Sequence, residues 1–461
     1  MTKNLFPKKV TASADNLAPT VEPTTETSSF SIYPSSSLQF QFPYIPSDVP
    51  LDPRSFPHQP RGNGNAVPAT LDNLRHLLSS YGINPRYNVI SKGLTLNIPG
   101  LNTLTDTADQ VSLSFLYSLA NLNGISTGTL PDFISALASQ NPYNPIAEWI
   151  ESQPWDGVDR LNAFYETLVV PEYFPTTFRD LLLRRWLISA VAAIFKPSGF
   201  RTRGVLTLQG PQSIGKTAFI RSLIDDPILR ESTIKLDHHM DASNKDSLLS
   251  AIRHWIVEIG ELDSSFRKDI ARLKGFLTSD IDRVRKPFGR VECDFPRRTV
   301  FCATVNDEQF LIDSTGNSRW WTIPVTKVNF EHGLPMQQVF AQILVEYKKG
   351  EIWWLNEAEE SQLTKLNRNH QQTTAIAEMV QKTLDHKRIG AEALPAMTAL
   401  DVLQLIDIKI PRNVQCKECA ALLREVLGQP KRINGKYKWR VPLNEDAQRK
   451  YDALKINRKC D

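Results

Sequence analysis

Apolar residues at helical spacing dominate the chain from residue 69 to residue 200. In ATLDNLRHLLSSYG, the residues Leu71, Leu74, Leu77 and Leu78 fall on one helical face, and Gly82 is a typical helix-ending residue. Similar segments follow with short breaks: ADQVSLSFLYSLANL, PDFISALASQ, IAEWIES, VDRLNAFYETL and residues 178–195. The pattern predicts a helical N-terminal domain over residues 69–200, in which we identify no catalytic constellation.

Short apolar runs of β-strand character begin near residue 204. They are VLTLQ (205–209), WIVEI (255–259), RTVFCAT (298–304) and RWWTIPV (319–325). Helical segments separate several of these runs, which is typical of βα units and a mostly parallel sheet. The sequence therefore predicts a multidomain α/β protein, with a second domain over residues 201–370.

The last part of the chain has a pattern of its own. Helices are predicted near residues 375–386, 398–406 and 412–427, followed by the hairpin KRINGKYKWRV (431–441). The pair Asn434-Gly435 favours a two-residue type I′ turn. Helices followed by a basic hairpin predict a winged-helix-like domain over residues 376–445, with a basic tail over residues 446–461.

Composition adds limits on the ends of the chain and on its environment. Residues 1–68 hold 11 of the 30 prolines together with many Ser and Thr, which predicts a disordered tail. Five cysteines in 461 residues favour a reducing compartment over a disulfide framework. The longest apolar segment, residues 181–195, contains Arg184 and Arg185, so we expect a buried helix and a soluble cytoplasmic protein without a membrane partner.

The segment GPQSIGKT (210–217) matches the phosphate-binding pattern G-x-x-x-x-G-K-[ST], between a predicted strand and a predicted helix. Its glycines let backbone N–H groups point at phosphate oxygens, Lys216 can reach the β- and γ-phosphates, and the Thr217 hydroxyl can hold Mg²⁺. We expect ATP and Mg²⁺ as cofactors. The expected nucleotide contacts are Gly210, Pro211, Gln212, Ser213, Ile214, Gly215, Lys216, Thr217 and Ala218.

Carboxylates that can complete such a site follow about 40 residues after the loop, in HWIVEIGELDSS (254–265). Glu261, at the end of the predicted strand, is our first choice for holding the metal or activating water, and Glu258 is the second. Asn306 closes another apolar run and can orient the attacking water. Arg319 lies in a glycine-containing loop and can reach the phosphates of a neighbouring subunit.

These motifs together resemble the virulence-associated E family. The resemblance covers residues 130–325 and rests on WDGVDRL (155–161), LTLQGPQSIGKT (206–217), WIVEIGELD (255–263), LKGFLTSDIDRVRKPFGR (273–290) and TVNDEQFLIDSTGNSRWW (304–321). It implies an AAA+-like P-loop ATPase related to superfamily 3 helicases. Such a protein would form a ring, expected to be hexameric, that moves along DNA in a bacterial host cell to begin replication of a phage or mobile island.

The resemblance also implies roles for single residues. Lys216 and Thr217 would form the P-loop pair, Glu261 with Glu258 the Walker B acids, Asn306 sensor 1, and Arg319 a finger acting in trans. Two departures are visible: Ser318 precedes the single Arg319 where many members have two adjacent basic residues, and the two acids lie three positions apart. No primase domain precedes the ATPase, so a separate primase is expected.

Basic residues mark two candidate DNA contacts. Residues 273–298 carry seven basic and four acidic side chains, and the resemblance implies that this segment forms a pore hairpin gripping single-stranded DNA. Residues 401–461 carry 14 basic and 8 acidic side chains, and a basic wing would bind a phosphate backbone, including that of an origin duplex. The candidate contacts are Lys274, Arg283, Arg285, Lys286, Arg290, Arg432, Lys436 and Lys438.

Three functions remain open on the sequence. The first is an ATP-driven DNA helicase or translocase for replication of a phage or island. The second is a P-loop ATPase that acts as a defence or regulatory switch without separating strands. The third is a non-enzymatic DNA-binding initiator whose nucleotide holds the oligomer together. The basic segment favours the first over the second, and the separate acid, Asn and Arg positions favour either enzyme over the third.

Overall fold

The structure of the chain is a computed structural model. It describes residues 50–60, 66–101, 107–197, 200–201, 203–260, 272–284, 293–311, 317–370, 375–391 and 393–460. Most of the predicted disordered tail, residues 1–49 and 61–65, lies outside the described residues. Within residues 50–60, however, η1 (Pro53–Ser55) forms and Phe56 is 1% exposed. The folded chain thus begins before residue 69, because Phe56 and Val67 add apolar side chains to the first hydrophobic cluster.

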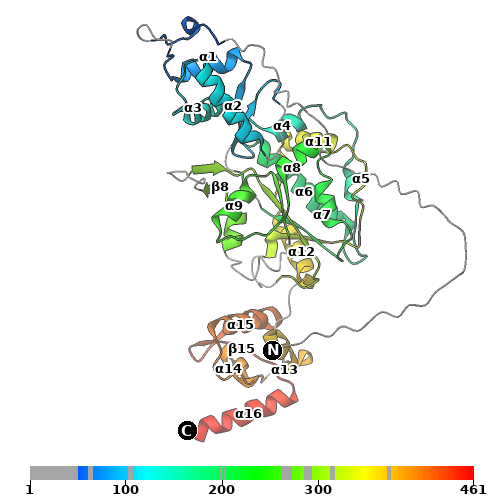
Figure 1. Cartoon of the computed structure of the whole chain (residues 1–461). Helices are drawn as coiled ribbons and strands as arrows, with labels where there is room; N and C mark the ends of the chain where they lie inside the picture. Colours follow the sequence, from blue (N-terminus) through cyan, green and yellow to red (C-terminus); the bar gives the residue numbers. More distant parts are fainter. Residues whose placement is uncertain are drawn as a thin grey trace, which may run out of the picture.

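The N-terminal unit combines three helices with a small sheet. The helices are α1 (Leu71–Ser80), α2 (Ala108–Leu122) and α3 (Leu130–Ser139), and the strands are β1 (Asn84–Asn88), β2 (Gly93–Asn97) and β3 (Pro142–Tyr143). The sheet order is β2-β1-β3, with β1 and β2 antiparallel. Figure 1 shows the three helices of this unit close together. The N-terminal domain predicted to be helical thus also contains a small sheet. Pro and Asn are depleted in strands, so NPRYN gives almost no local signal for β1.

Three further helices belong to the main core and not to the N-terminal unit. They are α4 (Pro145–Ile150), α5 (Leu161–Tyr165) and α6 (Thr176–Phe195). Helix α6 shares one hydrophobic cluster with Leu206 and Leu208 of the next strand, and the Trp186 indole donates to the Phe301 carbonyl at 2.9 Å. The predicted boundary at residue 200 therefore does not coincide with a break in packing. Among the described residues, no helix has the length and apolar character needed to cross a bilayer.

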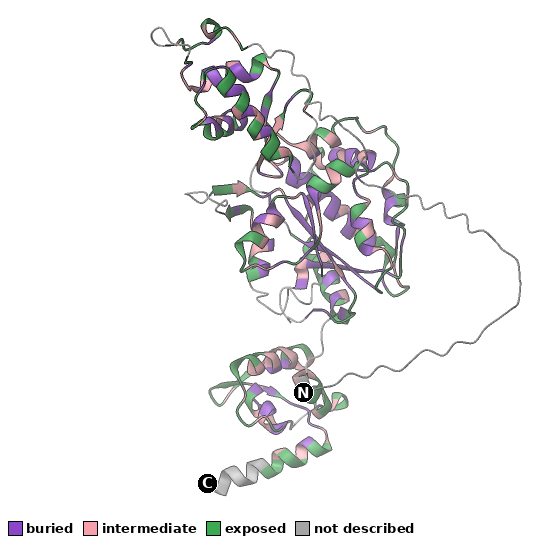
Figure 2. Cartoon of the chain, in the orientation of Figure 1, coloured by how far each residue is buried: buried purple, intermediate pink, exposed green. Residues whose placement is uncertain are grey.

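A five-stranded parallel sheet forms the centre of the molecule. Its strands are β5 (Val205–Gln209), β6 (Ile234–His238), β7 (Ile256–Ile259), β10 (Val300–Val305) and β11 (Trp320–Pro324), in the order β11-β5-β10-β7-β6. Alternate residues of β5 enter two hydrophobic clusters, Leu206 and Leu208 one and Val205 the other. Figure 2 shows these strands buried between layers of helices. This burial on both faces explains why the strands read as unbroken apolar runs.

Helices and short strands complete this central unit. The helices are α7 (Lys216–Arg221), α8 (Pro227–Thr233), α9 (Lys245–Ile252), α11 (Met336–Lys348) and α12 (Glu357–Asn367), with η2 (Asn317–Arg319) and η3 (Arg368–His370). The short strands are β4 (Leu168–Val169), which pairs antiparallel with β12 (Lys327–Val328), and β8 (Ile281–Val284), which pairs antiparallel with β9 (Cys293–Pro296). The β4–β12 pair places residues 165–170 beside the chain that leaves β11.

The C-terminal unit contains the predicted helices and hairpin. Its elements are α13 (Ala375–Thr383), η4 (His386–Arg388), β13 (Ala396–Met397), α14 (Ala399–Leu405), α15 (Asn413–Leu427), β14 (Lys431–Ile433), β15 (Lys436–Arg440) and α16 (Glu445–Cys460). Figure 1 shows α13, α14 and α15 gathered around β15. Asn434 and Gly435 have φ of 49° and 78°, the two positive values that a type I′ turn requires. The predicted basic tail is helical, as α16.

Candidate nucleotide-binding site

The phosphate-binding loop, residues 210–217, connects the carboxyl end of β5 to α7. Gly215 immediately precedes α7 with φ +97°, a conformation that glycine adopts at no steric cost. A Cβ atom at Gly215 would lie 2.4 Å from Cδ1 of Phe330, and one at Gly210 would lie 2.2 Å from the Val325 carbonyl oxygen. A side chain at either glycine would therefore clash with a close neighbour, and the positive φ of Gly215 also favours glycine.

Lys216 turns its ammonium group back into the loop. Nζ donates to the carbonyl oxygens of Gly210 at 2.7 Å and Pro211 at 2.6 Å, and to Oδ1 of Asn306 at 2.9 Å. Burial lowers the pKa of Lys216, and the nearby carboxylate of Glu258 opposes that shift. The loop thus holds a partly desolvated cation among acceptors that phosphate oxygens can replace.

Glu258 is the carboxylate that the fold brings to this loop. It lies on β7, is fully buried, and its Oε1 accepts hydrogen bonds from the hydroxyls of Thr217 at 2.6 Å and Thr304 at 2.8 Å. Its Oε2 accepts from the backbone N–H of Asp237 at 3.3 Å. Residues of three neighbouring segments therefore hold the carboxylate beside Lys216 and Thr217, the first two residues of α7.

The structure places one of the two predicted acids. Glu261, the first choice on sequence, lies outside the described residues. Glu258 contacts Thr217 directly, as a metal-holding acid of a P-loop site must. Thr304 was missed in the sequence, although a hydroxyl near the end of a parallel strand, two residues before Asn306, is a usable signal because such strand ends meet at one edge.

Asn306 and Arg319 lie at opposite ends of the parallel strands. Asn306 follows the carboxyl end of β10 and reaches Lys216. Arg319 precedes β11, whose first residue pairs with Val205, whereas the loop follows Gln209 at the other end of β5. Four steps along a strand, at about 3.3 Å each, separate these ends by roughly 13 Å. Asn306 thus contacts the loop of its own chain, whereas Arg319 lies at the far end of the strands from that loop.

Comparison with protein families places this site in a known domain. Residues 150–372 match the family model of the virulence-associated protein E-like domain. The resemblance drawn from the motifs is confirmed at the level of this domain. The match includes the loop, Glu258, Asn306 and Arg319.

Solved structures similar to the chain include two of the NrS-1 C-terminal region, both described as A form apo structures. One, of residues 305–718, has 12% identity and a TM-score of 0.41, over 80% of this chain and 98% of that chain. The other has 13% identity and a TM-score of 0.38, over 80% of this chain and 99% of that chain. No curated protein sequence matches this chain.

The basic segment within the matched region is only partly exposed. Arg285, Lys286 and Arg290 lie outside the described residues. Lys274 is 8% exposed, and Arg283 lies 3.2 Å from Asp294 in an ion pair on the β8–β9 hairpin. Burial of Lys274 does not suit a surface contact with DNA.

Two further cations of that segment have structural roles. Arg297 is buried, and its Nε donates to both oxygens of Asp282 at 3.0 and 2.9 Å. Arg298 donates to the Ile194 carbonyl at 3.0 Å. The net positive charge counted along residues 273–298 therefore overstates the charge available to a nucleic acid, because these two arginines fix the base of the hairpin.

The C-terminal hairpin presents more accessible cations. Lys431 lies opposite Lys438, and Arg432 lies opposite Tyr437. Arg432 and Lys436 are exposed, while the neighbouring Trp439 is buried and donates its indole N–H to the Gly428 carbonyl at 2.9 Å. Directly opposed like charges destabilise a hairpin unless an anion lies between or near them. This arrangement suits a phosphate backbone.

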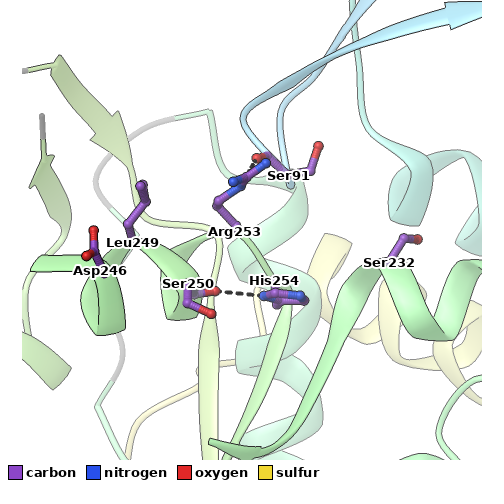
Figure 3. A pocket seen from close by; sticks show the side chains of 7 residues that line it. All are labelled: Ser91, Ser232, Asp246, Leu249, Ser250, Arg253 and His254. Atoms are coloured by element: carbon purple, nitrogen blue, oxygen red, sulfur yellow. Dashed lines mark hydrogen bonds between the residues drawn. The ribbon is translucent and has the colours of Figure 1, made fainter. Parts of the chain in front are cut away.

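A separate hollow of about 300 Å³ lies where the β1–β2 turn meets α9. Figure 3 shows Ser91, Ser232, Asp246, Arg253 and His254 around it. Arg253 Nε donates to the Ser91 carbonyl at 2.9 Å, and burial lowers the pKa of His254 to about 4. None of these lining residues belongs to residues 210–217. Ser91 comes from the N-terminal unit and Asp246 from α9 of the central unit, so the hollow lies at the junction between the two.

Proposed function

We propose that the protein binds ATP with Mg²⁺, hydrolyses it, and uses the energy to move along DNA during replication of a phage or mobile genetic island. The observation that carries the proposal is the 2.6 Å contact between Thr217 and the buried carboxylate of Glu258, beside Lys216. Burying an acid costs free energy, so stability alone does not explain why this carboxylate is held against the hydroxyl of a P-loop motif.

The donor set fits Mg²⁺. That ion prefers oxygen ligands and is commonly held by one or two carboxylates together with substrate phosphates. The Thr217 hydroxyl and the Glu258 carboxylate supply oxygens of the right kind at one point of the loop. Among the described residues, no three His, Cys, Asp or Glu side chains lie close enough together to bind a metal ion by themselves. Phosphate and water oxygens would therefore complete the coordination shell of Mg²⁺. Bound Mg²⁺ would neutralise charge that develops on the phosphates.

The chain's own residues then have separable tasks. Lys216 exchanges its contacts with the Gly210 and Pro211 carbonyls for phosphate oxygens, which are stronger acceptors because they are charged. Asn306, released from Lys216, orients the attacking water beside the γ-phosphate. The backbone N–H groups of the loop and the first turn of α7 bind the remaining phosphate oxygens.

Arg319 supports assembly into a ring. It lies at the opposite end of the strands from the loop of its own chain, and in a ring it would face the loop of an adjoining copy. In the described part of the chain, its buried Nε has no hydrogen-bond partner. A ring of six copies would place each Arg319 at a neighbour's phosphates, where an arginine raises hydrolysis rates by about 10³- to 10⁵-fold.

DNA would be bound at two places. The hairpin cations Arg432, Lys436 and Lys438 suit a duplex backbone, and the β8–β9 hairpin with Arg283 suits a single strand in the ring. Primers would come from a separate primase. The first of the three functions open on the sequence is therefore the one that we propose.

The test is Mg²⁺-dependent ATP hydrolysis with and without single-stranded DNA, together with displacement of a labelled strand from a fork. We expect hydrolysis that single strands stimulate, strand displacement that requires ATP, and loss of both in Lys216→Ala. Hydrolysis without any DNA response or displacement would instead support a regulatory ATPase. DNA binding without hydrolysis would support a non-enzymatic initiator.

A further inference from the structure

We propose that Phe330 is the stacking platform for the base of the bound nucleotide, an inference that rests on the proposed ATP site. Phe330 follows β12, and its ring edge lies over Gly215 of the phosphate-binding loop. A Cβ atom at Gly215 would lie 2.4 Å from Cδ1 and 2.7 Å from Cε1 of that ring. Phe330 nevertheless remains 39% exposed, so part of the ring faces solvent beside the loop.

The backbone on both sides of Phe330 is fixed. The N–H of Asn329 donates to the Thr167 carbonyl at 2.8 Å, which continues the β4–β12 pairing. Two residues further on, His332 Nε2 lies 3.1 Å from the Ser222 hydroxyl at the end of α7. The exposed ring is thus tied to the same helix that begins at the phosphate-binding loop.

The tautomer of His332 follows from its neighbours. The N–H of Leu334 donates to Nδ1 of His332 at 3.1 Å, so Nδ1 accepts and Nε2 carries the hydrogen that is donated to Ser222. Burial lowers the pKa of His332, which keeps the ring neutral near pH 7. The clamp therefore positions the segment, and the hydroxyl of Ser222 is not activated by it.

The exposed ring of Phe330 lies beside the loop, where the base of a bound nucleotide can contact it. The base of a nucleotide is joined to the phosphates held by the loop, and its flat face can cover the exposed part of the Phe330 ring. Among the described residues, no other aromatic ring stacks on Phe330. Stacking accepts any base, so the platform would add affinity for a nucleotide over inorganic triphosphate without reading hydrogen-bonding groups.

The experiment compares dissociation constants for ATP and for inorganic triphosphate, both with Mg²⁺, in the full chain and its variants. Loss of one base–aromatic stack corresponds to about 5- to 150-fold weaker binding. We expect Phe330→Ala to weaken ATP binding by that factor and to leave triphosphate binding unchanged. Phe330→Tyr should retain the parental affinity. Tyr437→Ala, which removes an exposed aromatic of the C-terminal unit, is the matched control.

Other outcomes overturn the proposal in distinguishable ways. Equal binding of ATP by Phe330→Ala and the parental chain would exclude stacking. Equal weakening of ATP and triphosphate would show that Phe330 supports the loop and not the base. Failure of the parental chain to bind either ligand would remove the proposed function itself. As a second readout, Phe330→Trp should change its fluorescence with ATP but not with triphosphate.

Discussion

The Thr217 hydroxyl donates a 2.6 Å hydrogen bond to the carboxylate of Glu258, and 41 positions separate the two residues in the chain. The contact exists because β7 and β5 are both neighbours of β10, so that the residue at the end of the loop and the acid on β7 meet at one edge of the sheet. It places Glu258, the acid of HWIVEIGELDSS that lies among the described residues, beside the candidate phosphate-binding motif.

Glu258→Gln tests this assignment. The amide can still accept from Thr217 but lacks the charge that holds a metal, so we expect hydrolysis to fall by about 10²- to 10³-fold. The measurement is the Mg²⁺ dependence of the ATPase rate. The exposed Glu231→Gln on α8 is the matched control. Near-parental activity of Glu258→Gln, with loss in Glu261→Gln, would return the metal-holding role to Glu261.

Arg319→Ala should spare ATP binding and lower turnover by about 10³- to 10⁵-fold, because the finger acts on the transition state of a neighbouring subunit. Mixing Arg319→Ala with Lys216→Ala should restore part of the activity. In such mixed rings, some interfaces join an intact Lys216 to an intact Arg319. Activity that stays absent in all mixtures, or an unchanged rate in Arg319→Ala alone, would contradict action in trans.

Charge reversal on the C-terminal hairpin should weaken DNA binding at all sequences. For Lys436→Glu with Lys438→Glu, we expect a lower affinity and a slope of log K against log salt that is shallower by about 2. Fluorescence anisotropy with labelled duplex over a salt series measures both. Lys349→Glu with Lys365→Glu makes the same change of charge on exposed residues of the central unit. Equal effects of the two pairs would exclude a specific role for the hairpin.

The buried Lys92 predicts how the stability of the folded chain depends on pH. It lies in the turn between β1 and β2, is 5% exposed, and donates to the Ile252 carbonyl at the end of α9. Burial lowers the pKa of Lys92 from 10.5 to about 8. The unfolded chain therefore binds more protons than the folded chain between these pH values, and stability contributed at this site rises with pH there.

Lys92→Met should remove that dependence. The difference in unfolding free energy, parental minus variant, should rise by about 3 kcal/mol between about pH 7 and about pH 10. Chemical denaturation at the two pH values measures it, and the exposed Lys349→Met serves as the control. A difference that stays constant with pH would show that Lys92 is not desolvated in the folded chain.

Periodicity predicted elements where local chemistry and fold agree. The leucines of α1, the apolar runs of β5, β7, β10 and β11, and the Asn434-Gly435 turn each carry a local signal that the structure confirms. The β1–β2 pair carries no such signal, since NPRYN forms a strand only through its pairing with GLTLN and its packing against α3. The folding of Phe56 onto the N-terminal unit escaped prediction for a similar reason, because prolines surround it.

The sequence by itself determined the phosphate-binding motif at residues 210–217, because the need for glycine at tight backbone positions and for Lys and Thr at phosphates leaves a local pattern. Only the tertiary structure decided that Glu258 meets Thr217, that Arg319 lies at the opposite strand end from the motif of its own chain, and that Arg297 is buried. These are relations between residues far apart in the chain, fixed by strand order and by packing on both faces of the sheet. Spacing along the sequence cannot specify them.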